Sequence, residues 1–166
     1  MAVEPRTLAG AQLFIGTDLV VDYTQADAAV AAAVELDSLT EVGWIENFGE
    51  IGDVAGVQTF TPVSRRRVMK FKTSFDAGES EYILGYVAGD GGLAVLLAAF
   101  DSDNDFNFKI VLPDEEGDSG DTPTLLYIAG KVISKPYRLN TVEDVMRRVI
   151  RVAWNNRLVE IPAVAA

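Results

Sequence analysis

Glu81-Tyr-Ile-Leu-Gly-Tyr-Val87 opens the stretch of sequence that decides the fold, and its β-branched and aromatic residues favour a strand. Ala88-Gly-Asp-Gly-Gly92 follows, and Asp90 can cap a helix there because its carboxylate accepts the free amide hydrogens of a first turn. The next segment, from Leu93 to Phe100, is apolar almost throughout. A helix that is apolar all round has to be covered nearly all round. The pattern therefore predicts one buried helix among strands.

This helix is expected to pack on the sheets through four large side chains. The predicted core-helix residues are Leu93, Leu96, Leu97 and Phe100. Asp101-Ser-Asp-Asn-Asp105 ends the helix, since short polar side chains compete for backbone hydrogen bonds and favour turns. Residues 106–112 then alternate between buried and exposed types, which is typical of a half-buried strand.

Strand patterns recur along the rest of the chain. They fall at 12–17 with 19–22 as one interrupted strand, in short pieces between 41 and 52, and at 57–61, 68–75 and 125–133. Two further segments are ambiguous. Residues 26–36 fit a short Ala-rich helix or a loop closed over the surface. Residues 142–154 fit a helix with a capping-box-like start or a strand, and their Val and Ile content leans toward the strand.

These elements predict a mainly β domain of the α+β class, a β-sandwich or barrel with one flanking α-helix. The 166 residues are expected to form a single domain. A flexible N-terminal arm is expected at about residues 1–10 and a C-terminal tail at about residues 155–166.

The composition excludes several classes of function. Fourteen Lys and Arg residues against 25 Asp and Glu residues give a net charge of −11, which disfavours a protein that grips nucleic acid by its phosphates. The absence of histidine and cysteine excludes disulfides, thiolate nucleophiles, the usual zinc sites and Ser-His-Asp catalysis. No apolar run reaches the ~18 residues of a membrane span, and no signal-peptide core is present. We therefore expect a soluble, non-enzymatic protein without a cofactor, a metal or membrane contact.

Two motifs have both a functional and a structural interpretation. Gly89-Asp-Gly-Gly-Leu-Ala94 matches G-x-G-x-x-A, and Asp114 lies roughly 25 residues beyond it, near where a ribose-binding acid lies in a dinucleotide fold. The alternative is a tight strand-to-helix turn, because a doubly wound fold needs several helices. Asp101 to Asp105 begins like a calcium loop, but Phe106 and Leu112 occupy the positions that need Gly and Glu, so an EF-hand is rejected.

Arg65, Arg66 and Arg67 form the only concentrated positive charge on this acidic chain. One interpretation is a solvated loop. The other is an interface with an acidic copy of the same protein.

Six segments together resemble the tail tube proteins (major tail proteins) of long-tailed, lambda-like bacteriophages in their order and spacing. They are Glu41-Val-Gly-x-Ile-x-x-Phe-Gly-Glu50, Pro62-x-x-Arg-Arg66, Lys70-x-Lys72, Gly91 to Phe100, Phe106-Asn-Phe-Lys-Ile-Val-Leu-Pro-Asp114 and Gly130-Lys-Val-Ile-Ser134. The resemblance covers residues from about 39 to 154. This sequence departs from the family pattern in a longer acidic loop after Asp114 and in a tail beyond Asn156.

The resemblance implies a β-sandwich or barrel with one helix, in which residues 142–154 form a strand. It implies hexameric rings that stack into a hollow tube, through which DNA passes without specific binding. The implied partners are further copies of the chain and the tape measure, terminator and baseplate proteins. The implied place is the virion tail, after assembly in the host cytoplasm.

In the resembled family a long loop reaches toward the adjacent ring, which makes the three arginines candidates for ring stacking. Their candidate partners on a neighbouring copy are Asp114, Glu115, Glu116, Asp118 and Asp121. Two alternatives remain open at this point: a dinucleotide-binding enzyme domain and a monomeric β-sandwich binding module.

Overall fold

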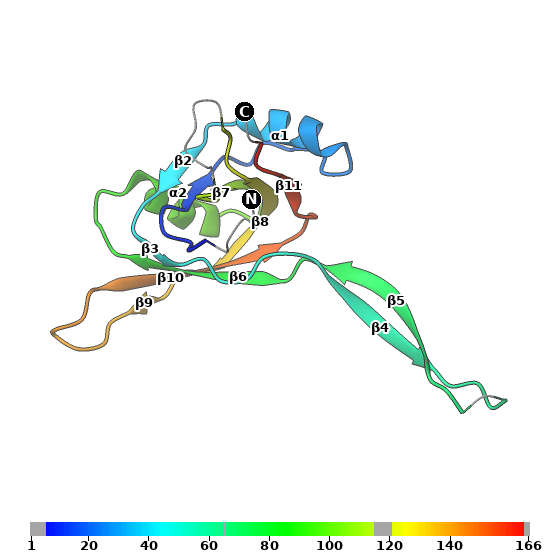
Figure 1. The fold of residues 1–166 in the computed structure, drawn as a ribbon. Coiled ribbons are helices and arrows are strands. Elements are labelled where there is room, and N and C mark those ends of the chain that lie inside the picture. The colour runs from blue at the N-terminus through cyan, green and yellow to red at the C-terminus, as the bar shows by residue number, and fades with distance from the viewer. Residues whose placement is uncertain (1–5, 65, 115–120, 165–166) are drawn as a thin grey trace.

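The computed structural model describes residues 6–64, 66–114 and 121–164 (Figure 1). Within these residues, nine strands form one sheet in which all neighbouring strands are antiparallel. The strands are β1 (Gln12–Ile15), β2 (Thr40–Val42), β3 (Ile45–Asn47), β6 (Glu79–Gly85), β7 (Phe106–Val111), β8 (Leu125–Ser134), β9 (Tyr137–Arg138), β10 (Arg147–Trp154) and β11 (Val159–Ile161).

The sheet curls because its two ends are joined by a short link. β2 and β3 lie at opposite ends of the strand order β2-β1-β7-β8-β10-β6-β3, yet only Gly43 and Trp44 separate them in the chain. Since one residue spans at most ~3.6 Å, this link holds the two ends of the sheet together. β11 adds to β8, and β9 adds to β10. The mainly β sandwich or barrel that the sequence predicts is confirmed.

α2 (Gly91–Phe100) packs against the inner face of the curled sheet. The predicted cap is present, because the Asp90 carboxylate accepts hydrogen bonds from the Gly92 amide at 2.9 Å and the Leu93 amide at 3.2 Å. The helix buries its side chains in a cluster that also contains Tyr82, Phe108 and Trp154. The indole of Trp154 meets the other two rings edge to face, at centroid distances of 5.1 and 6.4 Å.

A second helix, α1 (Asp27–Glu35), covers the opposite side of β8, so residues 26–36 form the helix of the two alternatives. Alternate residues of a strand point to opposite faces. Ile128 accordingly enters the inner core, whereas Tyr127 packs beneath α1. Glu35 ties the helix down, since it accepts a hydrogen bond from the Tyr127 hydroxyl at 2.7 Å and pairs with Lys109 at 2.5 Å.

The prediction of one interrupted strand over residues 12–22 is wrong in its second half. β1 ends at Ile15, after which the Asp37 carboxylate accepts hydrogen bonds from the Thr17 amide at 2.8 Å and its hydroxyl at 2.6 Å. Asn107 donates to the Leu19 carbonyl at 2.9 Å. Because side chains bind the backbone groups that a strand ladder would need, residues 17–22 form a loop. Burial raises the pKa of Asp37, but hydrogen bonds from Thr17 and Asn107 outweigh it and hold the pKa below 3.8.

The ambiguous segment 142–154 resolves into two parts. β10 occupies its second half, as the resemblance implies, and residues 141–146 form an exposed loop between β9 and β10. The end of the chain differs from the expected tail, because β11 pairs with β8 and Val159 is fully buried. Residues 6–10 of the expected N-terminal arm are exposed, and residues 1–5 and 165–166 lie outside the described residues.

Candidate assembly surface

The β4–β5 hairpin projects from the rest of the molecule as an arm (Figure 1). β4 (Val54–Phe60) and β5 (Met69–Asp76) pair with each other and with no other described strand. All residues of both strands are exposed except Ala55, which is partly buried. A two-stranded hairpin on its own is marginally stable in water. This arm is therefore expected to gain stability from a partner.

The register gives the hairpin two chemically different faces. Directly paired residues of antiparallel strands lie on the same face, and alternate residues along a strand lie on opposite faces. Phe60 pairs with Met69, whereas Val57 pairs with Lys72. One face, which we call the aromatic face, carries Phe60, Met69 and Phe71, and the opposite face carries Val57, Lys70 and Lys72; beyond a register shift between Ala55 and Val57, Phe75 pairs with Ala55 and joins this second face.

The aromatic face has no cover from the described part of the chain. Its three side chains are between 42% and 57% exposed. A contiguous exposed apolar patch on a folded protein marks an interaction site. Two open strand edges beside it offer unpaired backbone groups as well. The hairpin can therefore bind a partner through both apolar contact and main-chain hydrogen bonds.

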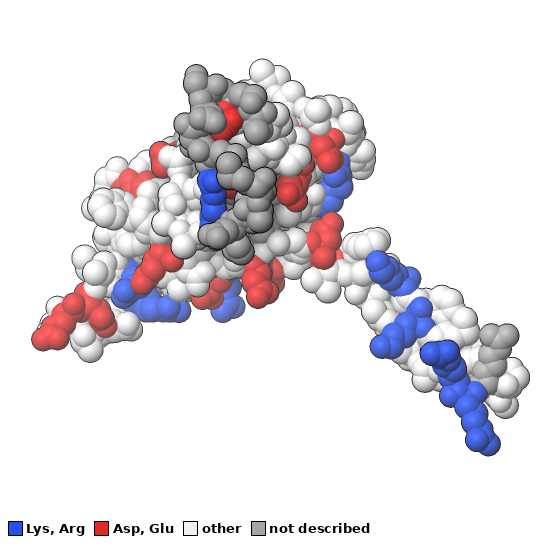
Figure 2. All heavy atoms as spheres, viewed as in Figure 1, with Lys and Arg blue, Asp and Glu red and all other residues white. Residues whose placement is uncertain are grey.

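The charge of the hairpin is opposite to that of the rest of the chain. The hairpin, residues 54–76, contains five basic side chains and one acidic side chain, a net charge of +4. The remaining residues contain nine basic and 24 acidic side chains, a net charge of −15. Figure 2 shows basic side chains along the arm and acidic side chains scattered over the body. Copies of this chain can therefore attract one another, arm to body.

The predicted stacking residues lie at two places in the fold. Arg66 and Arg67 are exposed near the tip of the hairpin, with no ion pair to any described residue, and Arg65 lies outside the described residues. Asp114 is held within its own chain, because its carboxylate accepts a hydrogen bond from the Thr124 amide at 2.7 Å. The acidic-loop residues Glu115, Glu116 and Asp118 lie outside the described residues, and Asp121 is partly buried.

The four predicted core-helix residues do not share one environment. Leu93 and Leu96 are 4% and 1% exposed, and Leu97 is partly buried against the same cluster. Phe100 differs from the prediction, since it lies at the end of α2 and is 36% exposed. The Lys135 ammonium lies 4.3 Å from the centre of the Phe100 ring, which gives the ring a cation–π partner at the surface.

The glycine-rich turn before α2 serves packing. A side chain at Gly92 would collide with the backbone of Glu41 and Val42, so the glycine lets α2 approach β2. The amides that bind a pyrophosphate in a dinucleotide fold are those of a helix N-terminus. Here the Asp90 carboxylate already binds them, and its second oxygen accepts a hydrogen bond from the Gly43 amide at 3.1 Å. The motif is thus used as a strand-to-helix turn.

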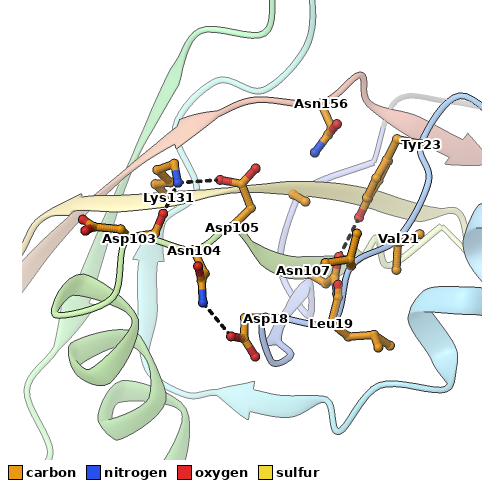
Figure 3. Close-up of a pocket in the computed structure, with 12 residues that line it drawn as sticks. Asp18, Leu19, Val21, Tyr23, Asp103, Asn104, Asp105, Asn107, Lys131 and Asn156 are labelled. Atoms are coloured by element: carbon orange, nitrogen blue, oxygen red, sulfur yellow. Dashed lines mark hydrogen bonds and ion pairs between the residues drawn. The ribbon is translucent and has the colours of Figure 1, made fainter.

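A hollow of about 500 Å³ lies between the 17–23 loop and strands β7 and β8 (Figure 3). Its polar groups bind one another, because the Tyr23 hydroxyl donates to Asn107 at 3.2 Å and Asn104 donates to Asp18 at 2.7 Å. Burial and the nearby Asp37 carboxylate both raise the pKa of Tyr23, so its hydroxyl remains a donor. These bonds fasten the loop onto the sheet.

Among the described residues, no cluster of acidic side chains is arranged to hold a metal ion. Over the same residues, no helix is long and apolar enough to cross a membrane.

The sequence reasoning missed the aromatic face of the hairpin and the exposed Trp44 at the link between β2 and β3. A signal for the first was available, because Met69 and Phe71 alternate with Lys70 and Lys72 in a segment of high charge. The alternation there predicts only a strand at residues 68–75. Sequence alone does not show that neither face meets the core.

No protein-family model and no curated protein sequence matches this chain. Several solved structures nevertheless share its fold. A chain of the anti-feeding prophage (AFP) baseplate superposes with a TM-score of 0.70 at 8% identity, over 96% of this chain and 97% of that chain. A chain of the PVC sheath/tube terminator, from an extracellular contractile injection system, gives a TM-score of 0.64 at 9% identity, over 97% and 99%. The SPP1 tail tube gives 0.63 at 13% identity, over 96% and 81%. The chain therefore has the fold of phage tail tube proteins and of related baseplate and terminator proteins.

Proposed function

We propose that this chain is a structural subunit of a phage-type tail tube, which self-assembles into hexameric rings that stack into a DNA-conducting channel. The observation that carries the proposal is the β4–β5 hairpin, whose aromatic face is uncovered in the described part of the chain. The fold shared with the SPP1 tail tube supports the same role. The AFP baseplate structure is six-fold symmetrised, which supports six copies in a ring.

A second copy of the chain is the partner that the charges favour. The hairpin carries +4 and the rest of the chain carries −15, so the contact between an arm and a neighbouring body is attractive. The same acidic excess would repel DNA that passes through the channel and let it slide without specific binding. The exposed Arg66 and Arg67 would then pair with carboxylates on a neighbouring copy and contribute to ring stacking.

The proposed role needs no catalysis and no cofactor. Its further partners are other tail components, namely terminator and baseplate proteins and a tape measure protein, and its proposed place is the virion tail after assembly in the host cytoplasm. The terminator and baseplate proteins that share the fold support such contacts between like-folded subunits.

Sedimentation velocity over a wide range of protein concentrations tests the proposal. The intact protein is expected to form ring-sized and larger species as its concentration rises. A variant in which residues 54–76 are replaced by a short Gly-Ser turn should remain monomeric and keep its melting temperature, because no other described strand pairs with the hairpin. An intact protein that stays monomeric at every concentration, with and without other tail components, would contradict the proposed function.

A further inference from the structure

Trp44 is an exposed aromatic residue in a strained position. Trp44 is 72% exposed to solvent. Its backbone φ of 57° lies in the left-handed region, which residues with large side chains rarely adopt. Non-glycine residues are held in this region when the surrounding structure fixes them, and such positions cluster at functional sites. Neither the core nor the hairpin explains why a tryptophan is presented here.

The backbone around Trp44 is fixed from two sides. The Gly85 amide donates to the Trp44 carbonyl at 2.8 Å, and the Gly43 amide donates to the Asp90 carboxylate at 3.1 Å. Asp90 in turn caps α2. The side chain of Trp44 is therefore presented by a rigid link between the two ends of the sheet, so little conformational freedom is lost when it is covered.

Trp44 lies at the centre of an apolar patch. It separates two shallow hollows, one lined in part by Gly85 and Val145 and the other by Gly89 and Val87. Val87 and Val145 are 40% and 65% exposed. We call Trp44, Val87 and Val145 the Trp44 surface.

The edge of the Trp44 surface is acidic. Glu41 and Asp90 line one hollow, and Glu46 lines the other, where it is already paired with Arg147. Glu143 and Asp144 precede Val145 in the exposed loop between β9 and β10. Figure 2 shows acidic side chains at the end of this loop, on the opposite side of the molecule from the basic arm.

We propose that the Trp44 surface receives the β4–β5 hairpin of a second copy of this chain. This assignment rests on the proposed self-assembly and names its acceptor surface. The two surfaces match, because an apolar patch with an acidic edge meets an aromatic face with basic residues beside it. Tryptophan is among the residues that contribute most to protein interfaces.

The placement of the two surfaces determines the kind of assembly. The hairpin and the β9–β10 loop project on opposite sides of the body (Figure 1). A contact between two different surfaces of identical subunits is head-to-tail, and it can repeat to close a ring or to extend a filament. Each copy then uses its arm on one neighbour and its Trp44 surface on the other.

A complementation experiment tests this assignment. The acceptor variant combines Trp44→Asn with Val145→Ser, since asparagine tolerates a positive φ. The donor variant combines Phe60→Ser with Phe71→Ser, which lie on the aromatic face. Both pairs of residues are exposed, so each variant should keep the melting temperature of the intact protein. Leu36→Ala, at an 85% exposed leucine after α1, is the matched control and should assemble normally.

Head-to-tail docking predicts that neither variant forms rings alone. An equimolar mixture should form heterodimers and nothing larger. The acceptor variant keeps an intact hairpin and the donor variant keeps an intact Trp44 surface, so each pair can form one contact. A photoreactive phenylalanine analogue at position 71 of the acceptor variant should crosslink to peptides of the donor variant that contain Trp44 or Val145.

Two results would overturn the assignment. The first is an acceptor variant that assembles like the intact protein, which would leave the proposed function standing but place the acceptor elsewhere. The second is a mixture of folded variants that gives neither heterodimers nor the crosslink. Failure of the proposed function gives a different result, because the intact protein would then remain monomeric at every concentration.

Discussion

Removal of one ring from the aromatic face of the hairpin should weaken assembly without weakening the fold. Phe71 is 48% exposed, and an aromatic side chain buries about 200 Å² when it is fully covered. A partner that covers the remaining surface therefore buries about 100 Å² at this ring. At about 25 cal/mol per Å², this burial contributes about 2.5 kcal/mol to one contact. Since about 1.4 kcal/mol corresponds to a factor of ten, Phe71→Ala should raise the concentration needed for assembly about 60-fold.

Sedimentation velocity on a dilution series measures this concentration directly, and thermal melting of the dilute monomer measures the fold. The melting temperature should be unchanged, because Phe71 lies on a hairpin that pairs with no other strand in the described part of the chain. Leu36→Ala removes an apolar side chain that is 85% exposed on another surface and should leave assembly unchanged. An unaltered assembly concentration for Phe71→Ala, or a loss of melting temperature as large as that of a core truncation, would refute the reasoning.

Four further outcomes follow from the same structure. Leu96→Ala, at a residue 1% exposed, should lower the free energy of unfolding by about 2–5 kcal/mol in chemical denaturation. Asp90→Ala should cost about 0.5–2 kcal/mol through loss of the cap on α2, and Asp90→Asn should recover most of it in the same assay. Arg66→Glu with Arg67→Glu should leave melting unchanged but shorten tubes in electron micrographs, and tubes of the unmutated protein should also shorten as salt rises. The pKa of Asp37 is lowered by folding, so its stabilising effect should be complete above about pH 4 and be lost as the pH falls through the lowered pKa; Asp37→Asn should flatten the acid side of a melting-temperature profile.

The sequence predicts the elements of this fold best where local chemistry and periodicity agree. Asp90 immediately before an apolar segment predicts a helix N-cap, and its carboxylate accepts hydrogen bonds from the Gly92 and Leu93 amides as predicted. The strand at 106–112 alternates cleanly and forms β7. Phe100 was expected in the core because it ends an apolar run, but helical rotation and the end of α2 place it at the surface beside Lys135.

The parts that could not be predicted depend on long-range contacts. The loop after β1 is held by Asp37, which lies 20 residues from Thr17, and by Asn107, which lies 88 residues from Leu19, so residues 19–22 look like a strand in isolation. The two-faced hairpin has the same alternation as a half-buried strand, and only its distance from the body reveals it as an arm. Trp44 looks like a core residue in sequence. Nothing local indicates that a hydrogen bond from the Gly85 amide to its carbonyl fixes the backbone while the side chain stays exposed.

Electron microscopy of the purified protein at high concentration tests the central claim most directly, because the claim concerns the shape of an assembly. We expect hollow six-membered rings that stack into tubes, with the β4–β5 hairpin of each subunit in contact with a neighbouring copy. Micrographs that contain only single subunits, or rings whose hairpins project freely into solvent, would contradict the claim.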